Sequence, residues 1–180
     1  MMVVYFTKRE VENGHKGESP MNDKTVTGRI DTVSKVIAAS PHTLYQAFMD
    51  PESLVKWLPP DGMRGEVDLF EPHAGGKYRL ILYYEGEQAT AGKTTENSDV
   101  SEGMFVELVL DMKIVTSGVF ESDDPDFKGV MMMTWYFEEN LEGTTVTVIA
   151  ENVPSGIKKD DHINGLTSSL ENLEYLTETR

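Results

Sequence analysis

The sequence predicts an α+β fold in which one curved antiparallel sheet wraps around a long C-terminal helix. A strand and two short helices come first, six segments with a period of two follow, and a long amphipathic helix comes last. Strands and helices do not alternate along the chain, which argues against a doubly wound parallel sheet. The last helix has one apolar face, and it must bury that face on the sheet.

The first strand and the two short helices are predicted over residues 29–58. Residues 29–37 are rich in β-branched side chains, which favour a strand. Ser40 followed by Pro41 indicates a helix start, because serine caps the first N–H groups and proline has no N–H to lose there. Asp50 followed by Pro51 repeats this signal. We therefore expect two short helices between residues 41 and 58.

The six segments of period two are predicted as strands of an antiparallel sheet. Their ranges are 65–71, 76–84, 103–110, 113–120, 129–138 and 144–152. Glu142 and Gly143 supply the turn between the last two strands. Residues 86–102 are polar and have no apolar rhythm, so they are predicted as a long loop, and residues 122–126 as a second loop.

Apolar residues spaced by three and four predict the final helix over residues 158–178. They are Ile163, Leu166, Leu170, Leu173 and Leu176. The chain before the first strand differs in composition from the rest. We therefore expect an N-terminal extension over residues 1–27 and one domain over residues 28–180. No basic residue precedes the short apolar start of the chain, so we expect no targeting segment.

Composition excludes several classes of function. The chain has 16 basic and 31 acidic residues and a formal net charge of -15, which disfavours nucleic acid as a partner. No apolar run approaches the roughly 20 residues of a membrane span, so membrane insertion is not expected. The absence of cysteine excludes disulfides, thiolate zinc sites and a cysteine nucleophile. It fits a cytoplasmic location.

Four groups of residues follow one another along the chain with a spacing that is typical of a known family. They are Ala39, Ser40, Pro41, Leu44, Tyr45, Ala47, Phe48, Asp50, Pro51, Glu52 and Trp57; then Gly75, Gly76, Lys77 and Tyr78; then Gly143, Thr144, Val146 and Val148; then His162, Gly165, Leu170 and Leu173. Together they resemble the START-like (SRPBCC, helix-grip) superfamily, and within it the homologues of the activator of heat-shock protein 90 ATPase. The resemblance covers residues 29–178 and departs from the family at Leu166, where the family usually has tryptophan, and in the long 86–102 segment.

This resemblance implies a helix-grip fold with a cavity between the sheet and the long helix. It also implies relatives that bind lipids, hormones or polyketides, although fold alone does not fix function. We interpret inward-facing residues as candidate ligand contacts. They are Tyr45, Trp57, Leu80, Leu82, Met133, Trp135, Phe137, Leu166, Ser169, Leu170 and Leu173. The alternative interpretation of each is an ordinary core residue.

Small residues on the last helix leave two explanations open. If close packing alone determined these positions, large side chains would be expected there. The residues present are small: Gly165, Thr167, Ser168 and Ser169. They either leave room for a ligand or allow the helix to approach the sheet closely. Ser169 is predicted as the lone hydroxyl of an otherwise apolar and aromatic cavity.

Motifs for catalysis are weak in this sequence. There is no Gly-x-Ser-x-Gly elbow, no Ser–His–Asp order and no His-x-x-x-His pair, so we expect no catalytic triad, no metal and no cofactor. His162 is interpreted as a packing or capping residue near the start of the last helix, with a ligand-facing role as the alternative. The paired carboxylates of an acidic chain are uninformative, because so many acids form pairs by chance.

Three functions remain as hypotheses. The leading one is non-catalytic binding of a hydrophobic or aromatic small molecule, lipid-like or polyketide-like, in the cavity. The second is a chaperone partner, as the family name suggests; the founding co-chaperone has two domains and only its C-terminal domain matches here. The third is an enzyme of the polyketide cyclase or aromatase kind, which needs tyrosine and histidine in the cavity for proton transfer.

Overall fold

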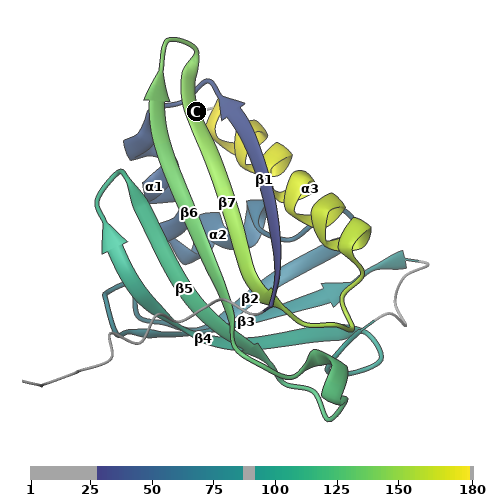
Figure 1. Ribbon diagram of the computed structural model, residues 1–180. Coiled ribbons are helices and arrows are strands. Elements are labelled where there is room, and N and C mark those ends of the chain that lie inside the picture. Colours follow the sequence, from purple (N-terminus) through teal and green to yellow (C-terminus); the bar gives the residue numbers. More distant parts are fainter. Residues whose placement is uncertain (1–27, 87–91, 179–180) are drawn as a thin grey trace, which may run out of the picture.

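A computed structural model describes residues 28–86 and 92–178 and shows a seven-stranded antiparallel sheet that curves around helix α3 (Figure 1). The strand order is β1-β7-β6-β5-β4-β3-β2. The strands are β1 (Arg29–Ile37), β2 (Met63–Phe70), β3 (Lys77–Tyr84), β4 (Ser98–Val109), β5 (Lys113–Phe120), β6 (Met131–Asn140) and β7 (Gly143–Val153). The helices are α1 (Pro41–Met49), α2 (Pro51–Trp57), the short 3₁₀-helix η2 (Pro125–Phe127) and α3 (Lys159–Glu178). The predicted extension over residues 1–27 lies outside the described residues.

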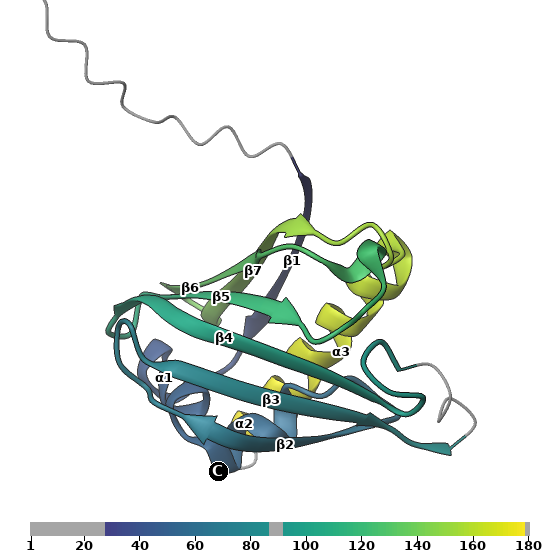
Figure 2. The same cartoon turned by 90° about the horizontal axis from the view of Figure 1, so that it is seen from below.

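The predicted fold class is confirmed. Strands β2 to β5 form one wing of the sheet and β6, β7 and β1 the other, and the view from below shows the helices within the curve (Figure 2). Helix α3 packs on β1 and on α1 and α2, while α2 also contacts β2. The helix therefore lies against the concave face, as its apolar stripe requires.

Local signals in the sequence account for the helix starts and the last hairpin. Ser40 Oγ accepts a hydrogen bond from the backbone N–H of Thr43 at 3.1 Å, and the carboxylate of Asp50 caps α2 in the same way. Gly143 opens β7 with a φ of +135°, and a Cβ there would lie 2.2 Å from the carbonyl oxygen of Ile37. Both its backbone angle and its close approach to the end of β1 therefore require glycine.

The prediction of a loop over residues 86–102 was wrong at its C-terminal end. Strand β4 begins at Ser98, five residues before the predicted strand start at 103, and pairs there with β3. Ser98 and Asp99 are only 4% exposed, because hydrogen bonds satisfy their polar side chains. The other strands lie within two residues of their predicted bounds. Residues 87–91 of this segment are outside the described part of the chain.

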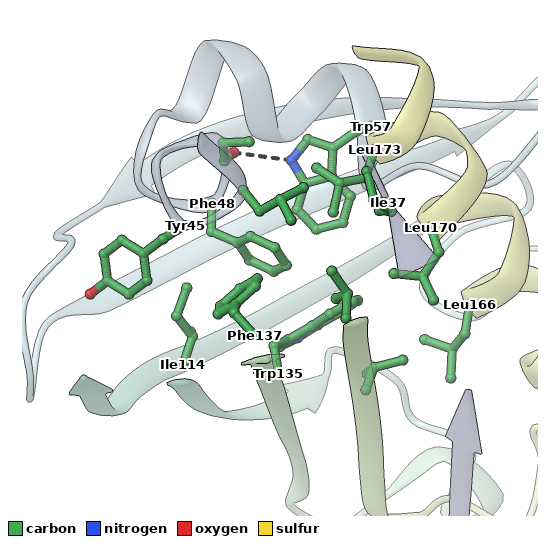
Figure 3. Close-up of a cluster of buried hydrophobic side chains, with 14 of the residues drawn as sticks. Ile37, Tyr45, Phe48, Trp57, Ile114, Trp135, Phe137, Leu166, Leu170 and Leu173 are labelled. Carbon is green, nitrogen blue, oxygen red and sulfur yellow. Dashed lines mark hydrogen bonds between the residues drawn. The ribbon is translucent and has the colours of Figure 1, made fainter. Parts of the chain in front are cut away.

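Two clusters of buried side chains fill the interior. The larger one joins α1, α2 and α3 from Leu166 onward to the sheet, and its centre is a group of aromatic rings (Figure 3). Phe48 contacts Trp57 and Trp135 with ring centroids 4.3 Å and 4.9 Å apart. The smaller cluster contains Ala150, Val153 and Ile157 near the start of α3. Met133 packs against both, so it marks the boundary between them.

Candidate functional site

A cavity of about 720 Å³ lies between the two clusters, under the N-terminal half of α3. Leu54, Leu58 and Pro60 bound it on one side, and inward-facing residues of β2 to β6 form its floor. Its volume is within the range of small-molecule sites, roughly 300–1,000 Å³. The interior of this domain is therefore not one continuous core.

The structure brings six of the eleven predicted ligand contacts into the cavity wall. They are Leu80, Leu82, Met133, Trp135, Leu166 and Ser169. The strand prediction behind them is confirmed, because Tyr78, Leu80, Leu82 and Tyr84 all face the cavity from β3. The period of two fixes which face these residues occupy.

The other five predicted contacts are outside the cavity wall and fill the larger cluster. They are Tyr45, Trp57, Phe137, Leu170 and Leu173. Trp57 is fully buried, and its Nε1–H donates to the carbonyl oxygen of Ala47 at 3.0 Å. The hydroxyl of Tyr45 points away from the labelled side chains in Figure 3. Leu170 and Leu173 lie fully buried in the second half of α3.

Small residues on the first half of α3 leave the cavity open. A Cβ at Gly165 would meet only Pro60 Cγ, at an ordinary contact distance of 3.6 Å. Close packing therefore does not require glycine at this position. Ser169 is not a hydroxyl donor available to a ligand, because Oγ lies 2.6 Å from the carbonyl oxygen of Leu58 and bonds it. Ser168 Oγ accepts from the N–H of Asp61 at 2.9 Å, which ties the adjoining loop to the helix.

One polar feature of the cavity is a carboxylate–imidazole pair between β1 and α3. His162 lines the cavity, and its Nδ1 lies 2.8 Å from Oδ2 of Asp31. The side chain of Asp31 is completely buried and also forms an ion pair with Arg29. Arg29 in turn donates to the carbonyl oxygen of Ile157 at 2.5 Å. His162 thus packs between β1 and α3 and also borders the cavity, which agrees with the ligand-facing alternative.

A second polar feature comes from the segment between β3 and β4. Lys93 Nζ donates to Asp99 Oδ2 and, at 2.9 Å, to the hydroxyl of Tyr84. The Tyr84 hydroxyl lies 2.9 Å from the same carboxylate oxygen, and the backbone N–H of Lys93 donates to Oδ1 of Asp99 at 2.6 Å. All three side chains line the cavity. The ammonium group is thus neutralised by a nearly buried carboxylate.

Burial and neighbouring charges shift the protonation of these groups. Burial lowers the pKa of His162 below its ordinary value, with Arg29 and Lys93 acting in the same direction and Asp31 opposing them. Burial also acts to lower the pKa of Lys93, but Asp99 and Tyr84 outweigh it and raise that pKa. Burial raises the pKa of Tyr84, against the opposing effect of Lys93. At neutral pH the imidazole is therefore neutral and the lysine is charged.

Sequence reasoning missed Lys93 and Asp99 as residues of the cavity wall, and Asp31 as the buried partner of His162 behind it. One signal was present: Asp31 falls in phase with the inward-facing Val33 and Ile37 of β1, where an acidic residue needs a partner. One partner, Arg29, is two positions away on the same strand, but the cavity-lining partner His162 lies 131 positions away, and no spacing rule connects it to Asp31. Lys93 and Asp99 stand in the segment predicted as a loop.

The arrangement suits the binding of a mostly apolar molecule with a few polar contacts at one end. In residues 28–86 and 92–178, no group of three or more histidine or acidic side chains is placed to hold a metal ion. None of the helices described by the structure is long and apolar enough to cross a membrane.

Solved structures share this architecture. A crystal structure of a Chromobacterium violaceum protein has a TM-score of 0.74 at 27% identity, covering 83% of this chain and 96% of that one. A solution structure from Arthrobacter aurescens has a TM-score of 0.71 at 15% identity, covering 88% and 91%. An AHSA1-like protein of Aeromonas hydrophila has a TM-score of 0.59 at 15% identity, covering 84% and 93%.

Family membership comes from the sequence model rather than from these structures. No curated protein matches this chain significantly. The family described as activator of Hsp90 ATPase homolog 1-like protein matches residues 38–178, which include α1, α2, α3 and every strand except β1. The chain therefore belongs to the family of activator of Hsp90 ATPase homolog 1-like proteins.

Proposed function

We propose that this protein binds a hydrophobic or aromatic small molecule, without catalysing a reaction, in the cavity under the first half of α3. The observation that carries the proposal is the cavity itself, which separates two packed clusters and is lined chiefly by apolar side chains. Burial of ligand surface against them supplies affinity at roughly 25 cal/mol per Å². The proposed setting is the cytoplasm.

The polar groups favour binding over catalysis in this proposal. The Asp31–His162 pair resembles part of a catalytic triad, but no hydroxyl among the described residues bonds to His162. Lys93 and Tyr84 are occupied by Asp99. Acid–base catalysis needs several polar groups that converge on the reacting atom, and the cyclase hypothesis stays third on this ground.

An exposed apolar patch supports a chaperone or other protein partner as a second candidate function. The outer-face patch consists of Leu69, Met104, Val119 and Val130, which are 39–53% exposed on neighbouring parts of the sheet and the loop before β6. Contiguous exposed apolar residues of this kind occur at interaction surfaces. Val119 belongs both to this patch and to the cavity wall, so the two surfaces meet at β5.

The test of ligand binding is titration with methoxypyrene, an uncharged fluorescent aromatic that has no hydrogen-bond donor. Ser101 lies in the cavity wall, paired with Leu80 on one neighbouring strand and with Phe120 on the other, which also line it. A Ser101→Trp variant therefore places an indole ring inside the cavity. We expect it to weaken methoxypyrene binding at least about tenfold, because the probe and the indole compete for the same volume.

The matched control is Val106→Trp, which adds the same ring at a position on β4 that is 46% exposed. It should bind the probe like the unmodified protein, and both variants should keep the far-ultraviolet circular dichroism of the folded domain. A protein that binds no methoxypyrene, or a Ser101→Trp variant that binds it fully, would contradict the proposed function.

A further inference from the structure

The polar end of the cavity contains a ring nitrogen that no described residue bonds, Nε2 of His162. Nδ1 of this histidine is hydrogen-bonded to Oδ2 of Asp31 at 2.8 Å. The same oxygen accepts a hydrogen bond from Nε of Arg29 at 3.2 Å. Because Oδ2 acts as an acceptor, the histidine is the donor and carries its proton on Nδ1. The neutral ring then presents a lone pair at Nε2.

The surroundings of His162 keep this ring neutral. Burial is the largest influence that lowers its pKa, and Arg29 and Lys93 repel an additional positive charge. Asp31 favours the charged form but does not outweigh them. Since the ordinary pKa of histidine is about 6.5, the ring is uncharged at pH 7 and offers an acceptor to the cavity.

Charges around the cavity do not favour an anion. Three basic and three acidic side chains line it: Arg79, Lys93, Lys158, Asp61, Asp99 and Asp161. Lys93 is paired with Asp99, and Arg79 with Asp68 and Glu121, while Lys158 is exposed to solvent. A ligand carboxylate at His162 would face a lone pair and, behind it, the buried carboxylate of Asp31.

We propose that the cavity selects an uncharged amphipathic molecule whose polar end carries a hydroxyl group, an alcohol or a phenol, that donates a hydrogen bond to Nε2 of His162. This inference rests on the proposed function, because it concerns the same cavity. The apolar body of the ligand packs on Leu80, Leu82, Met133 and Leu166. Without a donor, Nε2 loses its contact with water and gains no partner, so the hydroxyl determines selectivity.

The experiment compares three pyrenes of nearly equal size at pH 7.5: hydroxypyrene, methoxypyrene and pyrenecarboxylate. One neutral hydrogen bond corresponds to about fivefold in affinity, so hydroxypyrene should bind about fivefold more tightly than methoxypyrene. Pyrenecarboxylate should bind most weakly. Nitrogen NMR of the labelled imidazole supplies a direct readout: hydroxypyrene should shift the Nε2 resonance of His162, and methoxypyrene should leave it nearly unchanged.

Two variants test whether His162 causes the preference for hydroxypyrene over methoxypyrene. In His162→Phe the two neutral pyrenes should bind equally, whereas His73→Phe, which changes an exposed histidine outside the cavity wall, should keep the preference. Equal binding of both by the unmodified protein, tightest binding of the carboxylate, or a preference that survives His162→Phe overturns the inference and leaves the proposed function standing. Failure of all three pyrenes to bind overturns both. If a variant does not fold, the relative affinities of the three pyrenes for the unmodified protein still test the inference.

Discussion

A Trp57→Ala variant is expected to lose about 3–5 kcal/mol of its free energy of unfolding. Trp57 is fully buried at the end of α2, and its ring contacts Phe48 at 4.3 Å and Trp135 at 5.7 Å between centroids. Its removal leaves a void among aromatic rings and deprives the carbonyl oxygen of Ala47 of its donor. Urea unfolding, monitored by far-ultraviolet circular dichroism, measures the loss. Tryptophan fluorescence is unsuitable as the signal because the mutation removes a tryptophan.

Two further variants control for this result. Leu141→Ala, at the fully exposed tip of the β6–β7 hairpin, should change stability by no more than about 0.5 kcal/mol. Trp57→Phe should retain methoxypyrene binding, because Trp57 lies outside the cavity wall. A Trp57→Ala variant as stable as Leu141→Ala would contradict the packing described for this cluster.

An Asp31→Ala variant is expected to be less stable by about 3 kcal/mol, the lower end of the range for breaking a buried ion pair. Asp31 has no exposed side-chain area, and it is the partner of both Arg29 and His162. Without it the guanidinium group keeps its position near the start of α3 but has lost its counter-charge. The lower end applies because the Arg29 side chain is 28% exposed, although Nη2, the atom that pairs with Asp31, is buried.

Asp68→Ala is the matched control for Asp31→Ala. Asp68 also pairs with an arginine, but it is 43% exposed, and Arg79 retains Glu102 and Glu121 as partners. Its loss should change the urea midpoint only slightly, since exposed ion pairs contribute about 0–1 kcal/mol. If the two variants were equally stable, the buried pair would have no special role in holding α3 to β1.

The elements were predictable because their signals are local. Ser40 and Asp50 cap their helices through bonds to residues two or three positions on, which a short stretch of sequence can show. The start of β4 was missed because Ser98 and Asp99 look like loop residues by polarity. Their burial depends on Thr95 and Lys93, which the fold brings into hydrogen-bond distance.

Periodicity predicted which face of an element is buried, but it could not predict where that face touches a cavity. Leu166 and Leu173 belong to the same stripe on α3 and to the same core cluster, yet only Leu166 also borders the cavity. The difference arises from what lies opposite, namely the rings carried by α1 and α2 at one end of the sheet. Which side chains lie opposite is decided by chain segments far apart in sequence. The division between core and cavity therefore required the structure.

Helix α3 is held to the sheet unevenly along its length. Leu170 and Leu173 anchor its second half in the larger cluster, where Thr177 is also buried, while Gly165 and Ser168 of its first half lie over the cavity. Local openings occur where few apolar contacts resist them. In deuterium exchange, amides of the first half should therefore exchange by small fluctuations and those of the second half only with global unfolding. An occupied cavity would make the two halves exchange as one unit, so protection along a single helix reports whether the protein carries its ligand.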